Sequence, residues 1–278
     1  MPVPSISAIV ITKNEQSMIA NCLECLRWCS ELIVVDTGSD DQTVELAKRA
    51  GAKVISHHSH SFAENRQAAI AAAKGDWVCY IDADERILPI LAKEILVQAE
   101  TTGAHALTLQ RQNVLYGKKF KHGGWEKDYV TRIFRKNSFQ GWTGEIHESA
   151  HFPGKAVLLH QPLLHLTHRN TLDGLKKTIA WTPIEARLLA ESGHSPVKPI
   201  TLIRKGFMEF FRRGIWKGGL KDGMEGWVET LVQAMNRILV YIQVWELQQK
   251  PGLTQKYDEL ERDVLQEWEK AKHAPVEQ

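Results

Sequence analysis

The chain has 278 residues, a hydrophobic fraction of 43% and a charged fraction of 24%, which are values typical of a soluble globular protein. The net charge of +2 is too small to indicate nucleic-acid binding by itself. No stretch of about 18 uncharged apolar residues occurs, so no membrane-spanning helix is expected. The first residues lack a basic segment followed by an apolar core, so we also expect no secretory signal and a cytoplasmic location.

The first ninety residues alternate between strand-like and helix-like patterns. Predicted strands at 6–11, 32–35, 53–56 and 77–81 are separated by predicted helices at 15–28, 43–50 and 61–73. This alternation predicts an α/β fold with a mostly parallel sheet flanked by helices. Ligands of such sheets bind beyond the carboxyl ends of the strands.

Polar residues follow the predicted strands at those carboxyl ends. Thr12, Asn14 and Glu15 come after the first strand, Asp36 ends the second, and Asp82-Ala83-Asp84-Glu85 follows the fourth. Buried carboxylates are costly unless they are paired or bind a metal. Paired aspartates at a strand end favour a hard divalent cation whose remaining ligands are water and substrate phosphates. The sequence therefore predicts a site for a phosphorylated donor.

The pattern of predicted secondary structure changes twice further along the chain. Residues 105–166 carry short β-type segments, and predicted helices follow at 171–192, 200–216, 226–249 and 254–272. We expect a catalytic domain over 1–168, with a donor half at 1–100 and an acceptor half at 101–168, and a helical region over 169–278. Pro183 is expected to kink or divide the first of these helices.

Three motifs in this order resemble family 2 glycosyltransferases, which have the Rossmann-like GT-A fold. They are Thr12-Lys13-Asn14-Glu15, the strand that ends in Asp36, and Asp82-Ala83-Asp84-Glu85. With the later pair His147-Glu148, the chain is similar to the bacterial lipopolysaccharide core β-1,4-glucosyltransferase subgroup. It departs from the family at Gln67, where asparagine is common after the arginine that Arg66 matches.

The resemblance implies a UDP-sugar donor, with UDP-glucose favoured, and a saccharide or lipid-linked acceptor such as the lipopolysaccharide core. Contacts to the donor would come from the three strand ends and one helix, through Thr12, Asn14, Glu15, Asp36, Arg66, Asp82, Ala83 and Asp84. Within this set, Asp36 would accept a hydrogen bond from the uracil N–H, and Arg66 would reach the phosphates or Asp82. Mg²⁺ or Mn²⁺ would bind at Asp84, with His147 as a further ligand.

An inverting transfer needs a base carboxylate away from the metal motif, because the acceptor hydroxyl loses a proton as it attacks. Glu145 and Glu148 would face opposite ways on a strand, so only one of them should enter the cleft. By the resemblance we assign the base to Glu148.

Other side chains have two interpretations each. Arg132 and Arg135 suit a phosphate or an acidic acceptor, or are exposed strand arginines. Trp125 and Trp142 could stack on a sugar or pack in the core. For Glu85 the only role that we predict is to cap the following helix.

The segment 198–221 is strongly basic, with seven Lys or Arg residues against the single acid Glu209. On a helix, Ile203, Phe207, Phe210 and Phe211 would share one face, and Lys205 and Arg212 would lie opposite. This pattern predicts contact of 200–217 with an anionic membrane surface, which would make the protein peripheral on the cytoplasmic face of the inner membrane. The alternative is packing of the aromatic face on the catalytic domain, and the C-terminal helices could also form an oligomer.

Two other functions remain open from the sequence. A nucleotidyltransferase acting on a sugar phosphate also uses paired aspartates, but it usually carries a Gly-rich basic loop where this chain has Thr12-Lys13-Asn14-Glu15. A non-catalytic sugar-nucleotide-binding protein would not need the intact acids Asp82, Asp84 and Glu148.

Overall fold

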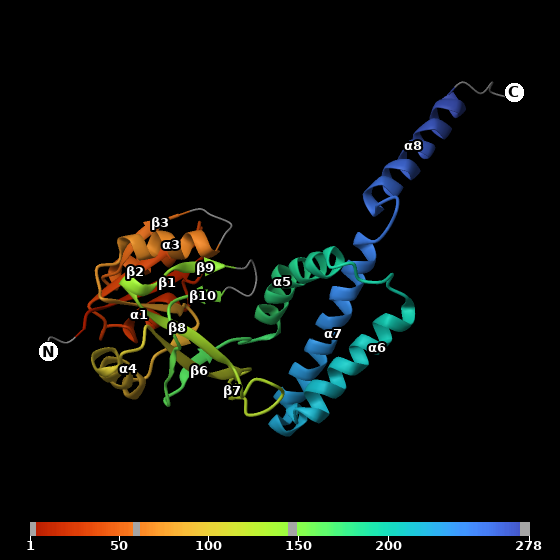
Figure 1. Ribbon diagram of the computed structural model, residues 1–278. Helices are drawn as coiled ribbons and strands as arrows, with labels where there is room; N and C mark the ends of the chain where they lie inside the picture. Colours follow the sequence, from red (N-terminus) through yellow and green to blue (C-terminus); the bar gives the residue numbers. More distant parts are fainter. Residues whose placement is uncertain (1–3, 58–61, 144–148, 273–278) are drawn as a thin grey trace, which may run out of the picture. The chain divides into compact units, whose positions relative to one another are not determined.

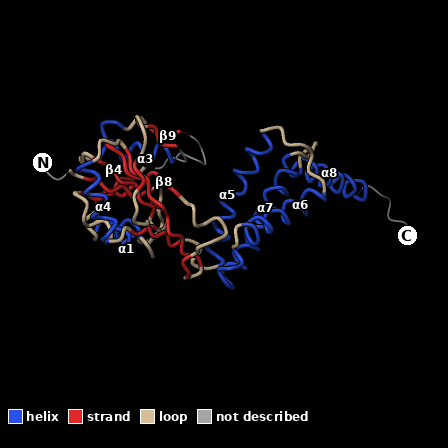
Figure 2. The backbone as a smooth tube through the Cα atoms, turned by 60° about the horizontal axis from the view of Figure 1, so that its bottom comes forward, coloured by secondary structure: helices blue, strands red, loops and turns tan. Residues whose placement is uncertain are grey.

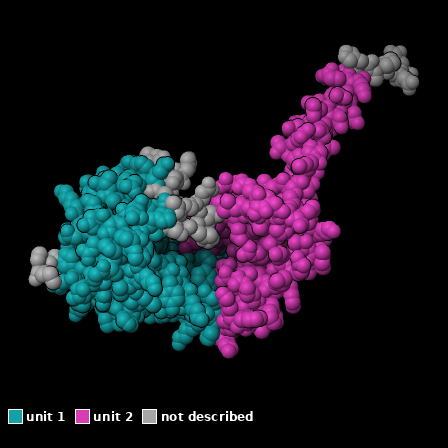
Figure 3. Space-filling view, in the orientation of Figure 1, with its two compact units in different colours: residues 1–171 teal, residues 172–278 magenta. Residues whose placement is uncertain are grey.

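The computed structural model describes residues 4–57, 62–143 and 149–272 of the chain. It contains two compact units, Met1–Thr171 and Leu172–Gln278, which are coloured separately in Figure 3. The first unit is a mixed α/β unit built on a large sheet, and the second is helical.

Four parallel strands form the first part of the sheet. They are β1 (Ile6–Thr12), β2 (Glu31–Asp36), β3 (Lys53–Ser56) and β4 (Trp77–Asp82). The helices between them are α1 (Ile19–Glu24), α2 (Thr43–Arg49) and α3 (Phe62–Ala72). The predicted α/β alternation is confirmed, although α1 is much shorter than the expected 15–28 because turns flank it on both sides.

The second part of the sheet mixes strand directions. Its strands are β5 (Glu85–Arg86), β6 (Ala106–Leu115), β7 (Lys118–Lys119), β8 (Tyr129–Arg135), β11 (Val157–Leu158) and β12 (Leu163–Leu166). Helix α4 (Pro89–Thr101) follows β5, and a 3₁₀ turn (Lys136–Ser138) follows β8. The strand order is β3-β2-β1-β4-β8-β6-β12-β5. Strand β8 is antiparallel to both β4 and β6, so it joins the two parts of the sheet. A separate pair is formed by β9 (Gly141–Thr143) and β10 (Ser149–His151).

Side chains alternate between the two faces of the sheet and build a core on each. Ala8 and Val10 of β1 join the core under α1 and α4, whereas Ile9 joins the core under α3 (Figures 1 and 2). The second core is aromatic, and the rings of Tyr80 and Trp142 meet edge to face with centroids 5.5 Å apart. Trp142 therefore packs in the core, in keeping with one of its two predicted interpretations.

The four cysteines are free thiols. Cys22 and Cys79 are buried, and burial raises the pKa of both thiols above the ordinary value. Buried neutral thiols are inert, which fits a packing role better than a redox role.

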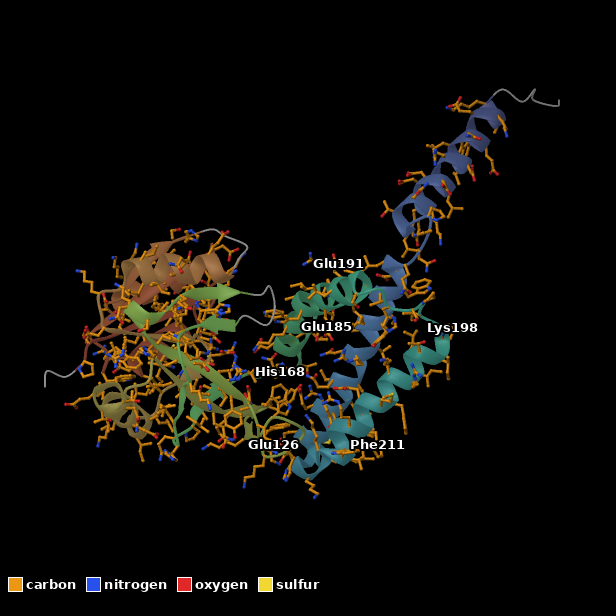
Figure 4. The ribbon with its side chains drawn as sticks, viewed as in Figure 1. Glu126, His168, Glu185, Glu191, Lys198 and Phe211 are labelled. Carbon is orange, nitrogen blue, oxygen red and sulfur yellow. The ribbon has the colours of Figure 1, made fainter. Side chains whose placement is uncertain are left out.

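The helical unit contains α5 (Thr171–Glu191), α6 (Pro199–Phe210), a π-helical turn (Phe211–Trp216), a 3₁₀ turn (Gly219–Asp222), α7 (Gly223–Leu247) and α8 (Leu253–Lys272). Helix α5 runs through Pro183 as one helix, so the expected division does not occur. Its contact with α7 includes an ion pair from Arg237 to Glu185 at 2.6 Å, and Glu185 is labelled on α5 in Figure 4. Among the described helices, none is both long and apolar enough to cross a membrane.

Gly75 provides a test of the packing beneath β1 and β4. A Cβ atom at Gly75 would lie 2.7 Å from the backbone nitrogen of Ser7 and 3.0 Å from the carbonyl oxygen of Ser5. We expect Gly75→Ala to lower the free energy of unfolding by about 1–3 kcal/mol, because backbone atoms must shift to make room. The measurement is urea denaturation followed by circular dichroism.

Gly103→Ala is the matched control, since nothing lies within 4 Å of a Cβ atom at Gly103. It should leave stability unchanged or raise it by less than about 1 kcal/mol. Equal losses in the two variants would contradict the close approach of Gly75 to Ser7.

Candidate active site

The carboxyl ends of β1, β2 and β4 meet at one edge of the sheet. Thr12 is the register partner of Asp36, and Ile11 is the register partner of Asp82. Three of the residues predicted from the sequence are therefore neighbours, although they are far apart along the chain. This edge is where ligands of open α/β sheets bind.

Hydrogen bonds hold the loops after β1 and β2 together. Asn14 has a left-handed backbone with φ of 56°, its N–H donates to Ser39 Oγ at 2.9 Å, and its Oδ1 accepts the N–H of Asp40 at 2.9 Å. The buried Asp36 carboxylate accepts the N–H groups of Gly38 and Ser39 at 3.2 Å. Asn14 and Asp36 thus shape this part of the edge.

Thr12 carries a polar atom that the fold leaves unused. The residue is 3% exposed, and its Oγ1 has no hydrogen-bond partner among the described residues. An unsatisfied buried hydroxyl costs about 1–3 kcal/mol, so it is best explained by a ligand or a water molecule at this place.

Asp82 is paired with an arginine from the other part of the sheet. The guanidinium of Arg132 bonds to Asp82 Oδ2 and lies 3.1 Å from Glu85 Oε1. Burial is the largest single influence and would raise the pKa of Asp82, but the positive charges of Arg132, Arg66 and His165 together keep that pKa below its ordinary value. For Glu85, which is fully buried, burial raises the pKa and Arg132 opposes it.

Asp84 lies beside a histidine for which the sequence offered no role. The distance from His165 Nε2 to Asp84 Oδ2 is 3.4 Å, and His165 Nδ1 lies 2.6 Å from Asn113 Oδ1. Asn113 donates through Nδ2 to the carbonyl of Trp125 and to Asp128, so its Oδ1 is the acceptor for Nδ1–H of His165. In the neutral imidazole this leaves the lone pair of Nε2 directed toward Asp84.

The contacts of the two aspartates belong to one polar network. From Asp82 to Asp84 it runs through Arg132, Glu85, Arg111, Asp128, Asn113 and His165. Arg111 binds Asp128 at 2.9 and 3.0 Å in a two-pronged contact. Both acids of the motif are therefore positioned by strands β6, β8 and β12.

Arg66 of α3 contacts the aromatic core and interacts electrostatically with Asp82 and Glu85. Its guanidinium carbon lies 4.4 Å from the centroid of the Trp142 ring. Burial, and then the neighbouring charge of Arg132, lower the pKa of Arg66 to about 10. Arg66 and Arg132 thus both act electrostatically on Asp82, and Gln67, which follows Arg66 in the sequence, is exposed.

Two sequence interpretations need correction. Glu85 does not cap a helix, because it lies in β5, is 0% exposed and is held by Arg132.

Arg135 lies away from the predicted donor site. Its guanidinium lies over the Trp77 ring at 4.7 Å, at the amino end of β4, about 17 Å along the strand from Asp82. Arg135 lines a cavity of about 640 Å³, whose lining includes none of the residues predicted as donor contacts, metal ligands or base.

Three predicted residues lie outside the described part of the chain. They are Glu145, His147 and Glu148, of which the latter two were assigned as metal ligand and base. In the sequence they follow β9, whose Trp142 contacts Arg66.

The donor atoms suit a hard divalent cation only in part. Asp84 supplies carboxylate oxygen and His165 supplies an imidazole nitrogen that is oriented by an amide, an arrangement common for metal ligands. Within the described ranges no group of three or more His, Cys, Asp or Glu side chains is arranged to hold a metal. Asp84 and His165 would supply two ligands to an ion that takes its others from water and a bound diphosphate.

The pairing of Arg132 can be tested by its removal. We expect Arg132→Met to lower the free energy of unfolding by about 3–5 kcal/mol, because two carboxylates lose their buried partner. Adding Glu85→Gln should restore part of the loss, since it removes the uncompensated buried charge. Urea denaturation of the single and double variants gives the coupling.

Arg49→Met is the control, since Arg49 forms an exposed ion pair with Glu45, and it should change stability by less than about 0.5 kcal/mol. Similar effects of Arg132→Met and Arg49→Met would contradict the pairing.

The pKa of Asp82 is lowered in the fold. The stabilisation that its ionised carboxylate contributes is therefore present above about pH 4 and is lost as the pH falls further.

Comparison with known proteins agrees with these observations. The sequence profile of glycosyl transferase family 2 matches residues 7–163. The lipopolysaccharide core biosynthesis glycosyltransferase LpsC of Rhizobium meliloti is 24% identical over 262 residues, which cover 88% of this chain and 94% of that protein. That match extends beyond the family profile and therefore into the helical unit.

Two further matches are partial. A TPR repeat-containing protein of Synechococcus elongatus is 36% identical over 115 residues, which are 41% of this chain and 28% of that protein. The solved structure of glucosyl-3-phosphoglycerate synthase from Mycobacterium tuberculosis, with Mn²⁺, UDP and glucosyl-3-phosphoglycerate, matches with a TM-score of 0.35 and 24% identity. That match covers 40% of this chain and 44% of the synthase chain. Since the family profile covers more than half of the sequence, and the α/β fold is the one its motifs implied, the chain belongs to glycosyl transferase family 2.

Proposed function

We propose that the α/β unit is an inverting, metal-dependent transferase that moves a sugar, with UDP-glucose as the favoured donor, to a saccharide or lipid-linked acceptor such as the lipopolysaccharide core. The observation that carries this proposal is the convergence of Thr12, Asp36, Asp82 and Asp84 at the carboxyl edge of the sheet in a family 2 chain. Similarity to LpsC, which is named for lipopolysaccharide core biosynthesis, supports the acceptor class.

The donor nucleotide would lie across the ends of β1 and β2. The Asp36 carboxylate has acceptor capacity beyond its contacts to Gly38 and Ser39, which suits the N–H of a uracil ring. Thr12 Oγ1 would gain the hydrogen bond that the described residues do not supply. Asn14 and Glu15 would act through the loop that borders the ribose.

The diphosphate would lie beside Asp82 and Asp84. A bound Mg²⁺ or Mn²⁺ would neutralise charge on the leaving diphosphate as the bond to the sugar breaks. We assign its protein ligands to Asp84 and His165, because Nε2 of His165 is directed toward that carboxylate. His147 remains a further candidate from the sequence.

The arginines next to Asp82 have a complementary role. Arg132 keeps Asp82 ionised, and Arg66 lies within its electrostatic reach. A dianionic leaving group beside these guanidinium groups gains charge-assisted hydrogen bonds, which are stronger than neutral ones. Fixed positive charge at this place stabilises the transition state more than the ground state, because negative charge grows as the bond breaks.

The proton of the acceptor hydroxyl must go to a carboxylate that is not held by these cations. Asp82 is a poor base because its pKa is lowered beside Arg132, and Glu85 is 0% exposed and so out of reach of an acceptor. Glu148 is our assignment for the base, with Glu145 as the alternative.

Ligand-induced stabilisation tests the donor site. With UDP-glucose and Mn²⁺ at about 100 times the dissociation constant, the folded state should gain about 2.7 kcal/mol, seen as a higher melting temperature. Asp84→Asn and His165→Gln should abolish the part of the shift that depends on Mn²⁺. Asp258→Asn, a change on the exposed helix α8, should keep it. A full Mn²⁺-dependent shift in Asp84→Asn would show that the metal ligands are wrong.

Transfer kinetics test the base. Glu148→Gln should lower kcat by about 10²–10⁴ while the shift with UDP-glucose and Mn²⁺ is kept, because only proton transfer is lost. Glu145→Gln serves as the comparison within the same segment. Normal transfer by Glu148→Gln, together with a loss in Glu145→Gln, would reverse the assignment.

A further inference from the structure

Helix α6 and the π-helical turn after it expose a continuous apolar face. Its members recur mostly at intervals of three or four residues and are 43–82% exposed: Ile200, Ile203, Phe207, Phe211, Ile215 and Trp216. We call this set the α6 apolar face. Lys198 marks the beginning of the helix and Phe211 follows its last residue (Figure 4).

The other side of α6 is already used for packing on α7. A Cβ atom at Gly206 would lie 2.6 Å from the Ile238 side chain, so the two helices are close there. Phe210 meets Trp227 of α7 with ring centroids 6.2 Å apart. The aromatic residues predicted as one face therefore divide, with Phe210 turned to α7 while Phe207 and Phe211 stay exposed.

The charges around this face are positive. The single acid between residues 198 and 221, Glu209, is 7% exposed and binds Arg212 and Arg213 at 2.5 and 2.7 Å. The exposed charged residues of the segment are all basic: Lys198, Arg204, Arg212, Lys217 and Lys221. Burying Glu209 therefore leaves a surface with no exposed acid.

Apolar and basic groups also meet in one groove. It has a volume of about 440 Å³, and its lining includes Phe207, Phe211 and Trp216, the bases Lys205 and Arg237, and Arg212 with its ion-paired partner Glu209. A phospholipid combines the complementary features, namely a phosphate for the guanidinium and apolar chains for the aromatic rings. A second copy of this chain, paired through the same face, would instead bring like charges together.

We propose that the α6 apolar face and its basic border form an interfacial anchor for anionic phospholipid. The aromatic and aliphatic side chains insert at the level of the headgroups, and the basic residues contact lipid phosphates. Trp216, at 82% exposure, has the amphipathic ring that is typical of membrane interfaces. This surface lies wholly within the helical unit, so the inference stands apart from the proposed transfer.

Vesicle co-sedimentation of the full chain tests the anchor. We expect binding to vesicles with about 30% phosphatidylglycerol and none to phosphatidylcholine alone, with a strong loss at about 0.5 M salt. Arg204→Gln with Lys217→Gln and Lys221→Gln should lower the partition coefficient about 100-fold. Phe207→Ser with Trp216→Ser should lower it at least about tenfold, since these side chains would no longer insert.

The control is Leu260→Ser with Val264→Ser on α8, where the apolar residues are 62% and 53% exposed but acids outnumber bases. It should bind vesicles like the parent chain, and circular dichroism checks the fold of every variant. The proposal is overturned by equal binding to phosphatidylcholine, by unchanged binding of the α6 variants, or by an equal loss in the α8 control. A parent chain that is oligomeric and does not bind vesicles, and that dissociates when Phe207→Ser and Trp216→Ser are introduced, would also overturn the proposal.

Discussion

The ion pairing of Arg132 with Asp82 and Glu85 is the interaction on which the site depends. Glu85 is fully buried, and a buried carboxylate without a partner would cost several kcal/mol. The guanidinium opposes the rise in pKa that burial imposes on the acids that follow the buried strand. Because Arg132 belongs to β8, the same contact also joins the two parts of the sheet.

In the network around the motif, the two aspartates have different partners. Asp82 is committed to arginine, whereas Asp84 faces an imidazole whose other nitrogen is held by Asn113. Groups fixed in this way lose little freedom when a ligand binds, which is the usual advantage of preorganised sites. The cost of ordering them was met when the unit folded.

The parts of this picture that depend on local pattern could be predicted from the sequence. Alternating strands and helices placed Thr12, Asp36 and Asp82 at one edge, because parallel strands end together. The partners of the acids could not be predicted, since Arg132 and His165 reach them through the strand order β4-β8-β6-β12-β5, which no local pattern encodes. In the helical unit the amphipathic pattern of α6 was visible, but small residues such as Gly206 decided which side packs on α7.

The position of His165 and Arg132 in the chain has a consequence for how the site comes into being. Asp82 and Asp84 are made early in synthesis, but their partners Arg132 and His165 lie 50 residues or more downstream. A nascent or truncated chain that ends near residue 100 would carry the complete acidic motif with none of these partners. The acidic motif in the sequence is thus distinct from the set of paired charges that it forms with Arg132 and His165. Only the folded unit through β12 contains both.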